Sequence, residues 1–368
     1  MSLLDRFAAS NERVKFYFQS SDGETEFLGL GIAEEFNNVP LKELTKILKQ
    51  SRRKMRLFGG QRFNANSRAD EEWEPFGSSY FFMPKVELIS RRSSRQLPLN
   101  PHVFAHAPID NAYTTLVRRA QEAIHRNEFE KAVIARRESL NIHVDFNCTE
   151  RLCHYLKINP SKTKFAFQID EEHCFFGASP EILYKRHGRL IESAAVAGTA
   201  QKDDSNLKTQ KNLAEHAFVS NFIAERMKQL CVNVQQANTE FTQSSNLWHL
   251  KTQFSGTLQN TVDDDAIIDA LHPTPALCGY PIQSSLEFIS SNEHFDRGYY
   301  GGLIGYLSNK SSEMSVAIRS ALRDKDQLHM YAGAGIIAAS DPDAEYQETL
   351  CKMSPVRTFF LNQSGCSV

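Results

Sequence analysis

Three charged side chains near the C-terminal end of the sequence have the spacing of one helix face. Glu345, Glu348 and Lys352 lie in the stretch SDPDAEYQETLCK, and on a helix they fall within about 60° of arc. Asp341 is a suitable N-cap residue, and Pro342 suits the first turn of such a helix. Carboxylates on one face can bind a hard cation such as Mg²⁺, but the same spacing is typical of a solvent-exposed face with ion pairs.

A segment of small residues, YAGAGI at 331–336, precedes this helix. We expect a tight turn at Gly333 and Gly335, whose backbone amides would hold an anion such as a carboxylate or a phosphate. The segment lacks both the GxGxxG pattern of dinucleotide-binding folds and the GxxxxGK[ST] pattern of P-loops. A turn that serves only close packing is an equally good interpretation.

Four more side chains have types suited to acid–base or metal chemistry. Lys131 opens the apolar stretch KAVIARR, and Glu181 follows a proline in GASPEIL. In a shared pocket these two would act as base and acid, because burial shifts pKa values toward neutrality; each is also typical of an ordinary surface residue. Glu215, in KNLAEHAF, suits either a metal site or a solvent-facing helix position. His249, in LWHLKTQFSGTL, is typical of a buried core or strand histidine.

Hydrophobic periodicity predicts the elements that must position these side chains. The expected helices and strands, in chain order, are helix 110–127, strands 131–139, 164–170 and 173–186, helix 207–230, and strands 301–307, 315–322 and 328–336. The segment HPTPALCGYP at 272–281 has three prolines, so we expect an irregular segment that forms one wall of a ligand site. This pattern indicates a mixed α/β (α+β) protein with large, mainly antiparallel sheets rather than a doubly wound parallel sheet.

Composition excludes several classes of function. The chain has 368 residues, 41% of them hydrophobic, and a formal net charge of -2 without long basic runs, so we expect no nucleic-acid binding. No apolar segment approaches the length of about 18 residues that spans a bilayer, so we expect no membrane insertion and a cytoplasmic protein. Seven cysteines without a CxxC pair predict reduced, mostly buried thiols.

Ten short motifs in order resemble the chorismate-utilising enzymes, the family of isochorismate, salicylate, anthranilate and aminodeoxychorismate synthases. The resemblance covers residues 110–353. The motifs are KAVIARR, FGASPE, AAVAGT, KNLAEH, HLKTQFSG, HPTPALCG, FDRGYYGG, AIRSA, YAGAGI and EYQETLCK. The resemblance implies one domain over 1–368, with a variable N-terminal part at 1–108 and a catalytic part at 109–361. It also implies two large, mainly antiparallel β-sheets surrounded by helices, and a Mg²⁺-dependent site in a cleft.

The same motifs carry site residues over to this chain. Glu215 and Glu348 match the Mg²⁺ ligands, and Glu345 matches an acid beside them. The matching substrate-binding residues are Gly198, Thr199, His249, Ala276, Leu277, Tyr300, Arg319, Gly333, Gly335 and Lys352. By the resemblance, Mg²⁺ would neutralise the ring carboxylate of the substrate. Arg319 and the amides near the two glycines would hold its enolpyruvyl carboxylate.

The family divides by the nucleophile that attacks the ring. Water-using members have a lysine at the position of Lys131, and ammonia-using members do not. Aminodeoxychorismate synthases have a nucleophilic lysine where this chain has Ala197. The resemblance therefore implies that water attacks C2 with Lys131 as base, while Glu181 protonates the departing C4 hydroxyl. The expected reaction is the reversible conversion of chorismate to isochorismate.

Several alternatives stay open. Menaquinone biosynthesis is favoured over a siderophore pathway, and stopping at isochorismate is favoured over salicylate formation with loss of pyruvate. Tyr300 also matches salicylate synthases. A non-catalytic ligand-binding subunit is another alternative, and ammonia-dependent synthesis with an amidotransferase partner is a third, which Lys131 disfavours. Many relatives have an acid where this chain has Asn212, which is expected to weaken Mg²⁺ binding. We expect a monomer or weak dimer without an amidotransferase subunit.

Overall fold

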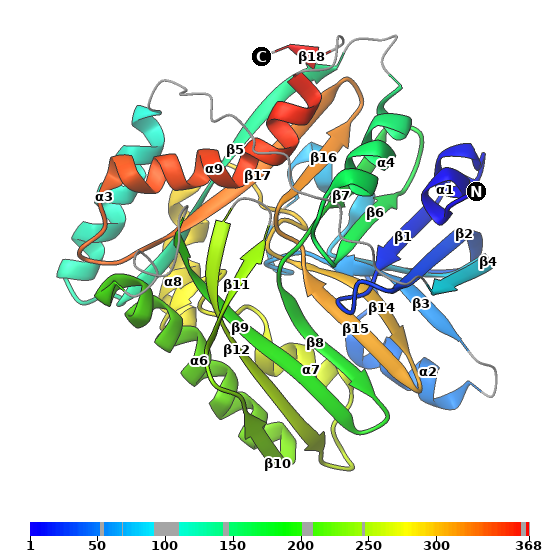
Figure 1. Ribbon diagram of the computed structural model, residues 1–368, viewed down its shortest axis with the longest axis horizontal. Helices are drawn as coiled ribbons and strands as arrows, with labels where there is room; N and C mark the ends of the chain where they lie inside the picture. The colour runs from blue at the N-terminus through cyan, green and yellow to red at the C-terminus, as the bar shows by residue number, and fades with distance from the viewer. Residues whose placement is uncertain are drawn as a thin grey trace.

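The computed structural model describes residues 1–51, 55–67, 69–91, 110–142, 147–200, 209–244, 247–361 and 366–367. Helices are α1 (Leu3–Ala9), α2 (Leu41–Gln50), α3 (Asn111–His125), α4 (Cys148–Ile158), α6 (Gln210–Leu230), α7 (Asp264–Leu271), α8 (Ile282–Asn292) and α9 (Pro342–Leu361), with a 3-10 helix at Glu71–Phe76. Figure 1 shows these helices arranged around a strongly twisted arrangement of strands. None of the described helices is long and apolar enough to cross a membrane.

The first half of the chain contributes nine strands. They are β1 (Lys15–Gln19), β2 (Thr25–Asn37), β3 (Arg56–Gln61), β4 (Ser79–Arg91), β5 (Lys131–Ile142), β6 (Lys164–Gln168), β7 (His173–Gly177), β8 (Ile182–His187) and β9 (Leu190–Ala200). The second half contributes β10 (Cys231–Gln236), β11 (Glu240–Ser244), β12 (Leu247–Leu258), β13 (Gly279–Tyr280), β14 (Leu303–Ser308), β15 (Ser311–Val316), β16 (Ser320–Asp324), β17 (Gln327–Ile336) and β18 (Cys366–Ser367).

All strand pairs are antiparallel, and they connect the strands in the order β12, β9, β8, β15, β14, β3, β4, β2, β1, β6, β7, β16, β17, β5. The long strands β2 and β4 join two halves of this network. Residues 26–30 of β2 pair with β1, whereas residues 79–82 of β4 pair with β3. The mixed α/β class with mainly antiparallel strands is confirmed, and the two expected sheets are two halves of one hydrogen-bonded network.

An aromatic core fills the space between the two halves. Phe58 of β3 lies 5.3 Å from Phe16 of β1, between ring centroids. Trp73, from the 3-10 helix, is fully buried and lies 5.2 Å from Phe175 of β7. Rings at these separations add edge and stacking attraction to the burial of their apolar area, so this core fixes how the halves face each other.

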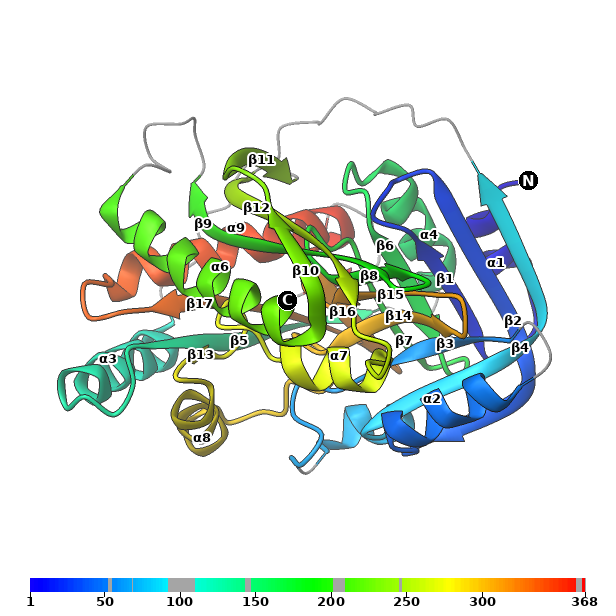
Figure 2. The ribbon, with the colours of Figure 1, turned by 90° about the horizontal axis from the view of Figure 1, so that it is seen from below.

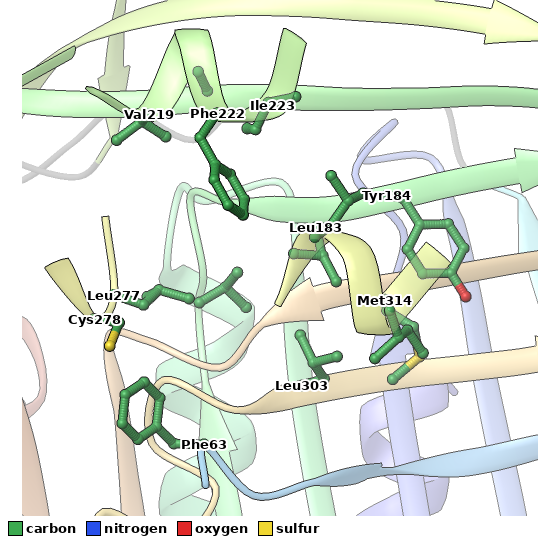
Figure 3. Close-up of a cluster of buried hydrophobic side chains, with 14 of the residues drawn as sticks. Phe63, Leu183, Tyr184, Val219, Phe222, Ile223, Leu277, Cys278, Leu303 and Met314 are labelled. Atoms are coloured by element: carbon green, nitrogen blue, oxygen red, sulfur yellow. The ribbon is translucent and has the colours of Figure 1, made fainter. Parts of the chain in front are cut away.

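A second core holds the long helix α6 against the strands behind it. Val219, Phe222 and Ile223 point from α6 toward the sheet, and Figure 3 shows them above Leu183, with Leu277 in the same cluster. Of the helix expected at 207–230, the part from Gln210 to Leu230 is confirmed, and residues 207–208 lie outside the described residues. Its apolar residues form one buried face. Because that face is fixed against the sheet, the direction of the Glu215 side chain on the same helix is fixed as well.

The strand expected at 315–322 is wrong, because two strands and a crossing occupy this segment. β15 ends at Val316 and pairs with β8 in one half, whereas β16 begins at Ser320 and pairs with β7 in the other half. Arg319, between them, has φ +53°, in the left-handed region. A residue in that region interrupts the ladder, so the chain passes from one half to the other at residues 317–319.

Candidate active site

A pocket opens where the ends of several elements meet. Its walls come from β5, β9, β12, β17, α6, α9, the irregular segment before β13 and the crossing before β16. The lining residues are Val133, Pro180, Glu181, Val196, Ala197, Gly198, Glu215, His249, Ala276, Leu277, Arg297, Tyr300, Gly301, Ile318, Arg319, Tyr331, Ala332, Gly333 and Lys352. Most residues carried over by motif therefore lie around one cavity.

Lys131 and Glu215 meet at one side of this pocket. Lys131, the first residue of β5, is fully buried, and its Nζ lies 3.1 Å from Oε1 of Glu215 on α6. A Cβ added at Gly335 would lie 2.6 Å from that Oε1 and 2.8 Å from Cε of Lys131. Gly335 is therefore needed because the ion pair packs directly against its backbone.

Glu181 is buried beside the pocket, between β7 and β8. Glu181 is only 4% exposed, and burial raises the pKa of its carboxyl group to about 8. The nearby charges of Lys131 and Lys352 act in the opposite direction and lower this pKa. Because burial prevails, the carboxyl group holds a proton at neutral pH, which is the state that a general acid requires.

Helix α9 contributes the expected charged face. Nζ of Lys352 lies 2.7 Å from Oε1 of Glu348 and donates to the carbonyl oxygen of Gly333 at 2.7 Å. Glu345, one turn earlier, is 1% exposed. The charges of Glu345 and Glu348 add to burial in raising the pKa of Tyr113. The helix is thus confirmed, and its charged face is buried at Glu345 and partly exposed at Glu348 and Lys352.

Gly333 and Gly335 lie inside β17, so the turn expected at these residues is wrong. Both residues face β5 in an unbroken register that runs from Gln327 to Ile336. Small residues are required here because the pocket and the Lys131–Glu215 ion pair lie directly against the strand. The strand expected at 328–336 is confirmed, because the glycines continue the ladder with β5 instead of interrupting it.

Arg319 is the strongest candidate for binding an anion. Its Nη1 is buried and has no hydrogen-bond partner among the described residues. Burial lowers the pKa of this guanidinium, while the negative charge of Glu348 raises it. A buried donor without a partner is costly, and a ligand carboxylate in the pocket would satisfy it.

Two more walls present neutral groups. His249 Nδ1 lies 3.2 Å from the carbonyl oxygen of Gly198, and burial lowers the pKa of this histidine to about 3. The imidazole is therefore uncharged at neutral pH. Gly198 has φ +72° and lies against Asn212 at the start of α6. Thr199 lies in β9, and its side chain is outside the described residues.

The remaining wall is aromatic and apolar. The ring of Tyr300 stacks on Tyr331 at 5.5 Å, and burial raises the pKa of Tyr300 to about 12, so its hydroxyl stays protonated. Ala276 and Leu277 lie in the segment before β13, as expected. Sequence reasoning missed Arg297 and Tyr331 as pocket residues. The motifs FDRGYYGG and YAGAGI contain them, but nothing in the sequence pattern indicated that these two side chains line a pocket.

The carboxylates of Glu215 and Glu348 are chemically suitable ligands for a magnesium ion. Among the described residues, no group of three or more His, Cys, Asp and Glu side chains could hold a metal ion. Mg²⁺ often uses one or two protein carboxylates together with water and ligand oxygens, and Glu215 and Glu348 are partly exposed carboxylates of this kind. Each is compensated by a lysine, so neither carries an isolated charge before a cation arrives.

The arrangement combines a protonated acid, a buried lysine and a buried guanidinium around one cavity. It suits proton transfer on a small anionic ligand. The family described as chorismate binding enzyme matches residues 1–116 and 100–360. The chain belongs to this family, whose substrate is such an anion.

Individual relatives are isochorismate synthases. The vibriobactin-specific enzyme of Vibrio cholerae is 29% identical over 370 residues, which cover 94% of this chain and 91% of that protein. Isochorismate synthase MenF of Escherichia coli is 26% identical over 389 residues, which cover 96% and 90%. The chloroplastic enzyme of Catharanthus roseus is 28% identical over 354 residues, which cover 82% of this chain but 61% of that protein.

The solved structure of the menaquinone-specific isochorismate synthase MenF from Escherichia coli has the same fold. Its TM-score is 0.83 at 24% sequence identity, and the match covers 98% of this chain and 91% of that one.

Proposed function

We propose that the protein is an isochorismate synthase, an isomerase that interconverts chorismate and isochorismate. The observation that carries this proposal is the buried carboxyl of Glu181 in the wall of the pocket that the Lys131–Glu215 pair adjoins, where burial raises the pKa of that carboxyl to about 8. An acid and a base of this kind are what a hydroxyl exchange on a ring requires. The names of the similar proteins support the same reaction.

In the forward direction, Lys131 takes a proton from a water molecule, whose oxygen forms a bond to C2 of chorismate. The ring double bonds shift, the C4–O bond breaks, and Glu181 gives its proton to the departing hydroxyl, which leaves as water. One water enters and one leaves, so the reaction is an isomerisation and is reversible. The proton that Lys131 gains balances the proton that Glu181 loses.

The substrate carries two carboxylates, and the pocket offers a partner for each. Arg319, with its unsatisfied Nη1, would bind one of them. Glu215 and Glu348 would bind Mg²⁺, with Glu345 beside them, and the ion would neutralise the other carboxylate. Lys352, which already bonds to Glu348 and to Gly333, would complete this anion site.

The test is product analysis with purified protein, chorismate and Mg²⁺, separated by liquid chromatography. Isochorismate as the product supports the proposal. Salicylate with pyruvate would instead assign a salicylate synthase, and turnover only with ammonium salts would assign an ammonia-using enzyme. Absence of any turnover, with chorismate still bound, would indicate a non-catalytic binding subunit.

The assignment of the base has its own test. Lys131→Ala is expected to abolish turnover while chorismate affinity stays within about tenfold, because the base acts in the chemical step rather than in binding. Calorimetric titration with chorismate measures the affinity. Turnover that survives this substitution would show that another group, or water alone, removes the proton.

We further propose a role in menaquinone biosynthesis, with a siderophore pathway as the alternative. Relatives of both kinds have similar identities, so the pathway requires a genetic test. Restoration of menaquinone in a bacterial strain that lacks its menaquinone-specific isochorismate synthase supports this assignment.

A further inference from the structure

The strand that carries Lys131 has an unusual outer edge. On one edge, β5 pairs with β17 over residues 132–141. On the other edge, β13 covers only Lys131 and Ala132, and β18 covers only residues 141–142. Between these two short pairings, no strand among the described residues lies along that edge, although the strand is buried over residues 131–136. Buried backbone groups need hydrogen-bond partners, so something other than a strand must supply them here.

A buried ion pair supplies two of them, while the carbonyl oxygen of Cys278 accepts a hydrogen bond from the backbone N–H of Val133 at 2.8 Å. Oε1 of Glu293 accepts a hydrogen bond from the backbone N–H of Ala135 at 2.7 Å. Arg297 donates from Nη2 to the carbonyl oxygen of Val133 at 2.6 Å, and from Nη1 to the carbonyl oxygen of Leu277 at 3.0 Å. Ser285 in the first turns of α8 contacts the same strand further along, and its Oγ donates to the carbonyl oxygen of Lys131 at 2.8 Å. In Figure 2, α8 lies on the opposite side of β5 from α6 and α9.

The pair itself is tightly held. Nε of Arg297 donates to Oε2 of Glu293 at 2.7 Å, and Nη2 donates to Oε1 at 2.5 Å. The side chains are 4% and 3% exposed, and the guanidinium lies 4.5 Å from the ring centroid of Phe63. Such bidentate pairs have a fixed geometry, so the bonds to β5 and to Leu277 have a fixed geometry as well.

Arg297 lines the same pocket as Arg319 but differs from it in its hydrogen bonds. Four donations from its five N–H groups go to protein oxygens. Nη1 of Arg319, in contrast, has no partner among the described residues. The N–H groups of Arg297 are therefore largely used in bonds within the protein, whereas Nη1 of Arg319 is available to a ligand anion.

We infer that Glu293 and Arg297 are positioning residues, which hold the Lys131 end of β5 and the Leu277 wall at the distance that the reaction needs. The pair acts through Lys131 and does not contact the reacting atoms. This inference rests on the proposed function, because it takes Lys131 as the base. A displacement of about 1 Å in a catalytic group is enough to lower a rate strongly.

The test compares Glu293→Gln and Arg297→Lys with the wild type, with chorismate and Mg²⁺ as substrate and metal. A glutamine presents an N–H group where Arg297 donates, and a lysine cannot bond to Val133 and Leu277 together. We expect kcat to fall at least about tenfold in each variant, while KM changes less than about threefold, because the chemical step loses its aligned base.

Asp264→Asn is the matched control. Asp264 forms a similar buried pair with Arg186, at 2.6 Å and 2.9 Å, and that arginine also bonds to backbone carbonyls far from the pocket. We expect this variant to lower the melting temperature as Glu293→Gln does, with kcat within about twofold of wild type. Equal kcat losses in the two variants, or a loss confined to KM, would overturn the positioning role.

Ser285→Ala keeps the experiment decisive if neither substitution of the pair yields folded protein. It removes one hydroxyl that contacts the Lys131 carbonyl, and we expect a severalfold loss in kcat, whereas an unchanged kcat would overturn the inference. A wild-type protein that does not form isochorismate would refute the proposed function instead, so the two failures are distinguishable.

Discussion

At the scale of single residues, Glu181 shows how burial decides chemistry. A carboxyl group on the surface would be ionised at neutral pH, but the buried Glu181 is held protonated by the cost of placing a charge out of water. Two lysines nearby reduce this effect without cancelling it. The group is therefore ready to give a proton at the pH at which most enzymes work.

The fraction of Glu181 that holds a proton is expected to fall as pH rises through about 8. The folded pKa of Glu181 is raised, so the carboxyl loses its proton above that value and can no longer protonate the departing hydroxyl. Initial rates between about pH 6 and pH 9.5 measure the effect. Because substrate and product differ by no net proton, kcat/KM for the reverse reaction must have the same pH profile. A profile without an inflection near pH 8, or an inflection that remains in Glu181→Gln, contradicts the assignment.

Substitution of Glu181 should lower kcat more than ionisation of its carboxyl group does. Glu181→Gln is expected to lower kcat by about 10²–10⁴-fold, the usual contribution of a general acid, with chorismate affinity little changed. Steady-state kinetics and calorimetric titration separate the two effects. A loss seen only in affinity would place Glu181 in substrate binding rather than in proton transfer.

Gly335→Ala tests the packing of the backbone against the Lys131–Glu215 pair. The added Cβ would lie 2.6 Å from Oε1 of Glu215, so the pair must move, and we expect kcat to fall about tenfold or more, which is about 1.4 kcal/mol in the barrier. Gly188→Ala is the control. Gly188 has φ +58° and open space around its Cβ position, so alanine there costs about 1–2 kcal/mol of stability without changing kcat. An unchanged kcat in Gly335→Ala would show that the pair has room to adjust.

At the scale of elements, α6 connects the hydrophobic core to the site. Phe222 packs into the core behind the helix, three residues from Val219 on the same face, and Glu215 extends from the helix into the pocket. The helix is therefore a rigid arm whose packing sets the position of a carboxylate. Strand β5 has the same function for Lys131, with β17 on one edge and the side chains of Ser285, Glu293 and Arg297 on the other.

Phe222→Ala should destabilise the protein by about 3–5 kcal/mol, the usual cost of removing a buried phenylalanine. The midpoint of urea unfolding measures it. Leu213→Ala is a suitable control on the same helix, because Leu213 is 48% exposed and its loss should change stability by no more than about 0.5 kcal/mol. Equal effects of the two substitutions would mean that the core behind α6 does not anchor the helix.

At the scale of the whole molecule, the pocket depends on the meeting of the two halves of the strand network. The chain crosses from one half to the other at residues 317–319, and this crossing places Arg319 in the pocket wall. The aromatic core between the halves fixes their relation. The site is therefore a product of the complete fold rather than of any one segment.

Metal removal should abolish activity without unfolding the protein. Glu215 and Glu348 each have a lysine partner, so the fold does not depend on a cation to compensate them. We expect a chelator to remove turnover, added Mg²⁺ to restore it, and the far-ultraviolet circular dichroism to stay the same throughout. Turnover that persists in excess chelator would exclude a role for the metal, and loss of the dichroism signal would show that the cation is structural.

The sequence by itself determined the chemistry that is available and most of the local structure. The order and residue content of ten motifs identified the family. Helical spacing predicted α9, with Glu345, Glu348 and Lys352 on one face. The long helix α6 and the strands β5 and β17 were also predicted, because their patterns are local and their apolar residues recur at regular spacing.

The tertiary structure alone decided which of these residues meet. Lys131 and Glu215 are 84 residues apart in the sequence, and no local pattern encodes their contact. The same holds for the proton on Glu181, which depends on burial by distant elements, for the crossing at Arg319, and for Arg297, whose partners lie on three different segments. Local patterns record the free energy of one helix or strand, whereas distances and dielectric surroundings in a pocket arise only when all the elements pack together.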